Sequence, residues 1–109
     1  MNTAKLEKPY DDLYSGEFKQ KLSETSTAVI LDVRTAEEFH SGRIPQAINI
    51  DVMDSSFVGK IAELDRAKTY FVYCRGGSRS GQACSIMTNR GLKVYNLAGG
   101  ITNWEGNII

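Results

Sequence analysis

The segment YFVYCRGGSRS, residues 70–80, indicates both the fold and the chemistry of this chain of 109 residues. Its first four residues are apolar or aromatic, which favours a buried β-strand. The strand ends at Cys74, and a glycine-rich turn with two arginines follows before a segment of helical period begins. In a strand–loop–helix unit of this kind, the loop amides and the helix N-terminus converge on the residue that ends the strand. Such surroundings stabilise an anion on sulfur, so Cys74 is the candidate nucleophile.

Strands and helices alternate on both sides of this unit. We expect strands at residues 28–31, 47–50, 69–73 and 93–97, and helices at 15–22, 55–64 and 80–90, besides a short helix after Thr35. The unbroken apolarity of residues 28–31 is typical of a strand buried on both faces of a parallel sheet. Strands that alternate with helices imply right-handed crossovers and an α/β fold. Ligands of such sheets bind beyond the carboxyl ends of the strands, which is where Cys74 lies.

Short local signals predict where the helices begin and end. Ser15 is expected to cap the first helix. Thr35 and Glu38 have the spacing of a capping box, in which each side chain serves the other residue's amide. Gly91 has the position of a residue that ends a helix in the left-handed conformation. The buried face of the helix at 55–64 is expected to consist of Phe57, Val58, Ile61 and Leu64.

Length and composition are those of an ordinary globular domain. A chain of 109 residues is long enough for one hydrophobic core and too short for two, so residues 1–109 are expected to form a single domain. Hydrophobic residues make up 41% and charged residues 24% of the chain. The 13 basic and 13 acidic side chains cancel, which argues against nucleic acid as a partner.

Other classes of protein are disfavoured by what the sequence contains. No apolar run approaches the roughly 18 residues of a spanning helix, so no membrane partner is expected. Residues 1–8 lack the apolar stretch of a secretory signal, which predicts a cytoplasmic protein. Two cysteines and the single histidine, His40, are too few for a disulfide framework or a structural zinc site. We therefore expect no metal and no organic cofactor.

Three blocks of sequence resemble the signatures of rhodanese-like domains. They are LDVR at 31–34 with EEF at 37–39 and GRIPQAIN at 42–49, then YCRGGSRS at 73–80, then Gly91 with YNLAGGI at 95–101 and Trp104. The blocks stand in family order and span about residues 29–104. Arg43 and Gln46 depart from the first block, where histidine and glycine are common. The resemblance implies a three-layer α/β/α fold around a central five-stranded parallel sheet.

The resemblance also implies sulfurtransferase activity through a cysteine persulfide. The Cys74 thiolate would take a sulfane sulfur from thiosulfate or another persulfide donor and pass it to cyanide or a thiol. The expected substrate-binding loop consists of Arg75, Gly76, Gly77, Ser78, Arg79 and Ser80. Its two glycines let the backbone curl around the sulfur, and its two arginines supply positive charge for an anionic donor. One of its two serines is expected to cap the following helix.

Other functions remain open at this point. A persulfide carrier would exchange sulfur with a partner protein and turn over small molecules poorly, and a noncatalytic binding module would not depend on Cys74. Cysteine phosphatases and the related arsenate reductases place five residues between the cysteine and an arginine. Here four residues separate Cys74 from Arg79, which favours sulfur over phosphorus chemistry. The sequence does not define the donor, the acceptor or a partner protein, and a monomer is expected.

Several neighbours of the loop have two interpretations. Asp32 and Arg34 close a strand beside the site, and they either orient the active loop or cap nearby backbone and pair with Glu38. The structural role is favoured for both. Cys84 is either a resolving thiol for a disulfide or a small side chain packed on the sheet, and the apolar residues around it favour packing. The pair Gly99–Gly100 is expected to let the last turn pack closely beside the active loop.

Overall fold

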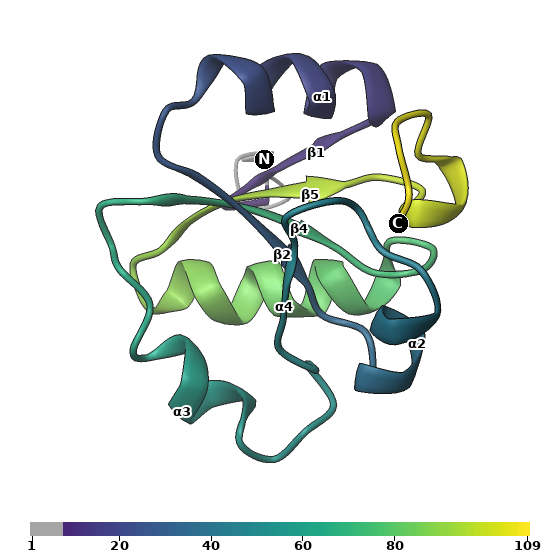
Figure 1. The fold of residues 1–109 in the computed structure, drawn as a ribbon. Coiled ribbons are helices and arrows are strands. Elements are labelled where there is room, and N and C mark those ends of the chain that lie inside the picture. The colour runs from purple at the N-terminus through teal and green to yellow at the C-terminus, as the bar shows by residue number, and fades with distance from the viewer. Residues whose placement is uncertain (1–7) are drawn as a thin grey trace, which may run out of the picture.

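The computed structural model describes residues 8–109, in which a five-stranded sheet lies between helices on its two faces (Figure 1). The strands are β1 (Asp11–Leu13), β2 (Ala28–Asp32), β3 (Ile48–Asn49), β4 (Thr69–Tyr73) and β5 (Lys93–Leu97). Their order across the sheet is β1-β5-β4-β2-β3, and every neighbouring pair is parallel. The helices are α1 (Ser15–Glu24), α2 (Ala36–Ser41), α3 (Phe57–Ile61) and α4 (Ser78–Asn89), with a 3-10 turn, η2 (Ile101–Asn103), after β5. The expected five-stranded parallel α/β fold is confirmed.

Alternate residues of the central strands face two separate hydrophobic cores, because side chains of a strand point to opposite faces in turn. In β4, Tyr70 and Val72 belong to the core beneath α3 and α4, and Cys74 continues this series beyond the strand. Phe71 and Tyr73 belong to the core beneath α1 and the last turn of the chain. The strand that carries Cys74 is thus buried on both faces, and this fixes the position of the thiol.

The strand β1 was not predicted from its own residues. It has only three residues, two of which are exposed aspartates, so it shows neither apolar continuity nor a clear alternation. It pairs through its backbone with β5 at the edge of the sheet. The strand predicted at 47–50 covers only Ile48–Asn49 in the structure. Ala47 instead closes a turn, because its amide donates to the Ile44 carbonyl at 3.2 Å.

Two predicted helix features are wrong. Ser15 is the first residue of α1 rather than its cap, which is Tyr14. The Ser15 hydroxyl instead accepts a hydrogen bond from the Glu105 amide at 3.0 Å and so holds the C-terminal segment against α1. The helix expected at 55–64 covers only Phe57–Ile61, and Val58 is 39% exposed, because a helix of one turn buries little more than a single i, i+4 pair.

Other local predictions hold. The capping box at the start of α2 is present in both directions, with the Thr35 hydroxyl accepting from the Glu38 amide and the Glu38 carboxylate accepting from the Thr35 amide. Gly91 follows α4 with φ of 82°, as expected for a left-handed residue at a helix end. Within residues 8–109, no helix combines the length and apolarity that crossing a bilayer would need.

Candidate active site

Cys74 follows the last residue of β4, and the loop after it closes around its sulfur. The Gly77 amide donates a hydrogen bond to the Cys74 Sγ at 3.1 Å, and the Ser80 hydroxyl donates to it at 3.3 Å. The residue is only 1% exposed. Gly77 adopts φ of 105°, a conformation that side chains oppose, and α4 begins directly after it. The loop therefore forms a cradle around the Cys74 thiol, of the kind that the sequence predicts.

The cradle stabilises the thiolate. Burial by itself would raise the pKa of the Cys74 thiol, but hydrogen bonds from Ser80, Gly77 and Gly76 outweigh it. The net effect is a pKa below the ordinary value for cysteine. These are fixed donors, so they favour the anion without a neighbouring base. A sulfur held in this way can attack a small electrophile and then carry a second anionic sulfur atom.

The serine predicted to cap α4 does not do so. The N-cap is Gly77, and no side chain caps the helix. The fully buried Ser80 hydroxyl instead lies between the Cys74 Sγ at 3.3 Å and the Gly77 carbonyl at 3.1 Å, and these two acceptors share its single proton. Ser78 is the first residue of α4, and it is exposed. The sequence could not separate these two serines, because capping and sulfur binding both require a hydroxyl within the same turn.

The last turn of the chain holds the first half of the cradle. The Ile101 amide donates to the Cys74 carbonyl at 2.9 Å, and the Thr102 amide and hydroxyl donate to the Arg75 carbonyl at 3.2 and 2.8 Å. A Cβ on Gly100 would lie 2.2 Å from the Arg75 carbonyl oxygen. The expected close approach of Gly99–Gly100 to the active loop is therefore present, and it excludes any side chain at residue 100.

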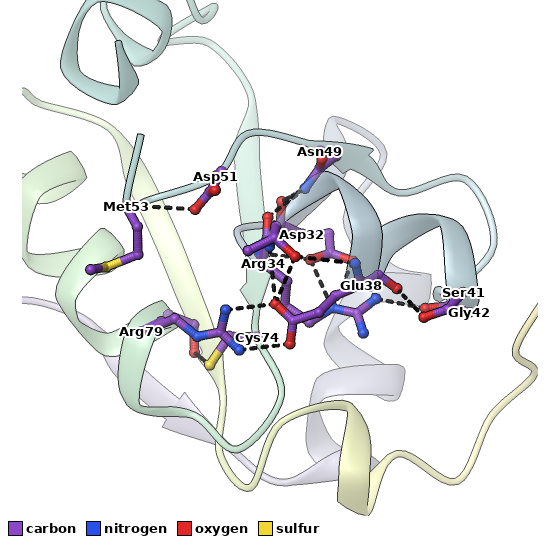
Figure 2. A network of polar contacts seen from close by, with 12 residues as sticks. Asp32, Arg34, Glu38, Ser41, Gly42, Asn49, Asp51, Met53, Cys74 and Arg79 are labelled. Carbon is purple, nitrogen blue, oxygen red and sulfur yellow. Dashed lines mark hydrogen bonds and ion pairs between the residues drawn. The ribbon is translucent and has the colours of Figure 1, made fainter. Parts of the chain in front are cut away.

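Arg79 leaves the cradle and forms a two-bond ion pair with Glu38 of α2 (Figure 2). Its Nη1 lies 2.7 Å from the Glu38 Oε1, and its Nη2 lies 3.0 Å from the Oε2. Hydrogen bonding to Arg79 outweighs burial and lowers the pKa of Glu38 to about 2, with the Thr35 donors contributing. Sequence reasoning placed Glu38 in the capping box and as a partner for Arg34, and it missed Arg79, because a separation of 41 positions leaves no local pattern.

Arg75 is the other cation of the loop, and it differs from Arg79 in its surroundings. Its side chain is exposed, and within residues 8–109 it has neither a hydrogen bond nor an ion pair. Only its carbonyl is engaged, by Thr102. The two arginines that the sequence treats alike thus differ in the part of the chain that the structure describes, where Arg79 is paired and Arg75 has no partner.

Asp32 and Arg34 form a buried ion pair with each other, at 0% and 6% exposure. The Arg34 Nη2 lies 2.7 Å from the Asp32 Oδ2 and also donates to the Gly42 carbonyl at 2.6 Å. Glu38 is not their partner, which corrects that part of the sequence interpretation. The link to the active loop passes through the backbone, since the Val33 amide between them donates to the Tyr73 carbonyl at 3.0 Å.

Two further candidate residues lie away from the cradle. Cys84 is fully buried in α4 among the apolar side chains of the core, and burial raises the pKa of its thiol. This position fits the packing interpretation of Cys84. His40 is exposed on α2, with its ring 5.5 Å from that of Phe39. Within the described part of the chain, no three acidic, histidine or cysteine side chains gather as metal ligands.

Comparison with known proteins identifies relatives of this chain. The family model of the rhodanese-like domain matches residues 15–107. The putative sulfurtransferase YtwF of Bacillus subtilis is 35% identical over 95 residues, which cover 87% of this chain and 90% of that protein. The thiosulfate sulfurtransferase GlpE of Pseudomonas savastanoi is 35% identical over 79 residues, which cover 72% and 73%. The crystal structure of a rhodanese-related protein from Thermoplasma volcanium superposes with a TM-score of 0.81 at 28% identity, over 92% of this chain and 98% of that one.

Proposed function

The chain belongs to the rhodanese-like family, and we propose that it is a sulfurtransferase that carries a sulfane sulfur as a persulfide on Cys74. The observation that supports this most directly is the cradle, in which the Gly77 amide and the Ser80 hydroxyl both donate to the Cys74 Sγ. A terminal persulfide sulfur is an anion at neutral pH, and converging donors of this type favour anions in a site with little water. A noncatalytic binding module has no use for such donors around a thiol.

The reaction consists of two transfers of one sulfur atom. The Cys74 thiolate attacks the sulfane sulfur of thiosulfate, so that a new S–S bond forms while the bond to the sulfonate group breaks and sulfite leaves. The resulting Cys74 persulfide then gives its outer sulfur to cyanide or a thiolate, and the Cys74 thiolate is restored. Charge balances in each step, and no external oxidant or reductant is needed.

Thiosulfate is the donor that the relatives suggest, since one of them is a thiosulfate sulfurtransferase. Arg75 is available to attract its sulfonate group, because the side chain is exposed and has no partner within residues 8–109. A second candidate function is that of a persulfide carrier, which receives sulfur from another thiol. The ion pair of Arg79 with Glu38 favours this second function, because it leaves fewer free charges for a small anionic donor.

The intact mass of the protein after brief treatment with thiosulfate tests the proposal. We expect a gain of one sulfur atom, about 32 Da, that a reductant removes. The Cys74→Ser variant should fold but gain nothing, whereas Cys84→Ala, which changes the buried thiol of α4, should gain sulfur like the natural chain. Sulfur gain in Cys74→Ser, or none with any sulfane donor in the folded protein, would contradict the assignment.

A further inference from the structure

The Glu38 carboxylate is held in place from two sides. Its Oε1 accepts from the Thr35 amide at 3.0 Å and from the Thr35 hydroxyl at 3.2 Å, within the capping box of α2. Both of its oxygens also accept from Arg79. A carboxylate fixed by its own helix cannot swing aside at low cost when another anion approaches Arg79.

The same contacts use the part of Arg79 that would bind an oxyanion. A guanidinium binds two oxygens of a carboxylate, sulfonate or phosphate group through paired N–H donors. In Arg79 the Nη1 and Nη2 atoms both face Glu38. After the hydrogen bond and charge of Glu38, the negative charges of Cys74 and then Asp51 also raise the pKa of Arg79. On this side of the cradle, an incoming donor therefore meets an arginine whose positive charge is already compensated by a carboxylate.

We propose that Glu38 determines donor specificity by occupying the oxyanion-binding edge of Arg79, which disfavours small dianions such as thiosulfate against monoanionic alkyl persulfides. The inference rests on the sulfurtransferase function proposed above and concerns the choice of donor. Thiosulfate needs a cation for its sulfonate oxygens and must compete with Glu38 for Arg79. An alkyl persulfide carries no sulfonate: the Cys74 thiolate attacks its outer sulfur, the donor's S–S bond breaks and the alkyl thiolate leaves, so Arg79 is not needed to bind the donor.

The kinetic test compares Glu38→Gln with Glu37→Gln in the same helix. Glutamine at residue 38 keeps the capping box but removes the charge that holds Arg79. Glu37 is exposed in the same turn of α2, so its variant removes an equal charge without touching Arg79. The donors are thiosulfate and the persulfide of 2-mercaptoethanol at constant ionic strength, and thermal melting checks that both variants are folded.

We expect Glu38→Gln to raise kcat/KM for thiosulfate about two- to fivefold, mainly through a lower KM, because the variant removes a partly exposed ion pair that competes with thiosulfate for Arg79. In Glu38→Gln the kcat/KM for the alkyl persulfide should change less than twofold. In Glu37→Gln the kcat/KM for both donors should change less than twofold. An unchanged or lower kcat/KM for thiosulfate in Glu38→Gln would overturn the inference. So would an equal rise for both donors, or an equal rise in Glu37→Gln.

A binding measurement keeps this test separate from turnover. Calorimetric titration of thiosulfate into Cys74→Ser, with and without Glu38→Gln, should show a Kd about two- to fivefold lower in the double variant. Sulfur transfer with no difference in Kd would refute the role of Glu38 and leave the proposed function standing. A lower Kd with no transfer to the natural chain from either thiosulfate or the alkyl persulfide would refute the proposed function and support the role of Glu38 in anion binding.

Discussion

Gln46 has a backbone conformation that its side chain opposes. It follows Pro45 in the turn that the Ala47 amide closes on the Ile44 carbonyl, and its φ is 71°. A proline at the second position and a positive φ at the third are typical of a type II turn, which favours glycine at that third position. The turn is thus formed in this chain with a strained residue at its third position.

Replacing Gln46 by glycine is expected to stabilise the protein. The relief of left-handed strain is partly offset by the greater freedom of glycine in the unfolded chain, so we expect a gain of about 0.5–1 kcal/mol in the free energy of unfolding. Urea denaturation measures this change. Gln46→Ala is the control, because it removes the same side chain but keeps a Cβ and should bring no gain. A loss of stability in Gln46→Gly would contradict the turn assignment.

The ion pair of Asp32 with Arg34 predicts a loss of stability when one charge is removed. Asp32→Asn leaves the Arg34 guanidinium buried without its counter-charge, which costs about 3 kcal/mol. Asp11→Asn makes the same change at an exposed position of β1 and should have little effect. Chemical denaturation of the two variants provides the comparison, and similar stabilities would show that the buried pair contributes nothing specific.

The contact of η2 with the active loop depends on the absence of a side chain at Gly100. In Gly100→Ala the new Cβ would collide with the Arg75 carbonyl, and residue 100 also has φ of 66°. We expect a loss of about 2 kcal/mol or more in stability, together with slower sulfur uptake by Cys74, since the turn must move away from the cradle. Denaturation and the rate of mass gain with thiosulfate report the two effects.

Gly16→Ala is the matched control for that variant. Gly16 lies in α1, and a Cβ added there would have no other atom of the described chain within 4 Å beyond its own surroundings in the helix. Because alanine favours helices, this substitution should raise stability slightly and leave sulfur uptake unchanged. Equal behaviour of the two alanine variants would mean that η2 does not position the loop.

The elements differ in how well the sequence predicts them, for physical reasons. The bounds of β4 and β5 are as expected, because each is a run of strand-forming residues between clear breaks. The capping box is local and was therefore predictable. The strand β1 and the pairing of Glu38 with Arg79 depend on partners far along the chain, β5 for the strand and α4 for the carboxylate. Only the folded sheet brings these segments together.

The site as a whole is assembled from three parts of the chain. The loop after β4 supplies the cradle, η2 binds its first two carbonyls, and α2 supplies the carboxylate that pairs with Arg79. Loss of the fold therefore separates Glu38 from Arg79, and the pKa of Glu38 becomes sensitive to global unfolding. This connects the stability of the protein to pH.

The dependence of stability on pH follows from the lowered pKa of Glu38. The folded value of about 2 lies below the ordinary value of 4.5, so the stabilisation is fully present above pH 4.5 and is lost as the pH falls towards 2. Because the side chains of Glu38 and Arg79 are 27–28% exposed, we expect this stabilisation to be about 1 kcal/mol. The free energies of unfolding of the natural chain and of Glu38→Gln, measured by denaturation across pH, should differ at pH 7 and converge near pH 2. A difference that stays constant with pH would contradict this.

The hydrogen bond from the Gly77 amide to the Cys74 sulfur has a spectroscopic consequence. An amide proton that points at sulfur senses the charge on that atom, and its resonance moves when the thiolate becomes a persulfide or is protonated. The Gly77 and Gly76 signals in a nitrogen–proton correlation spectrum are therefore internal indicators of the state of the thiol. They would allow sulfur loading and unloading to be followed in real time, without a dye, a coupled enzyme or a change in the sequence.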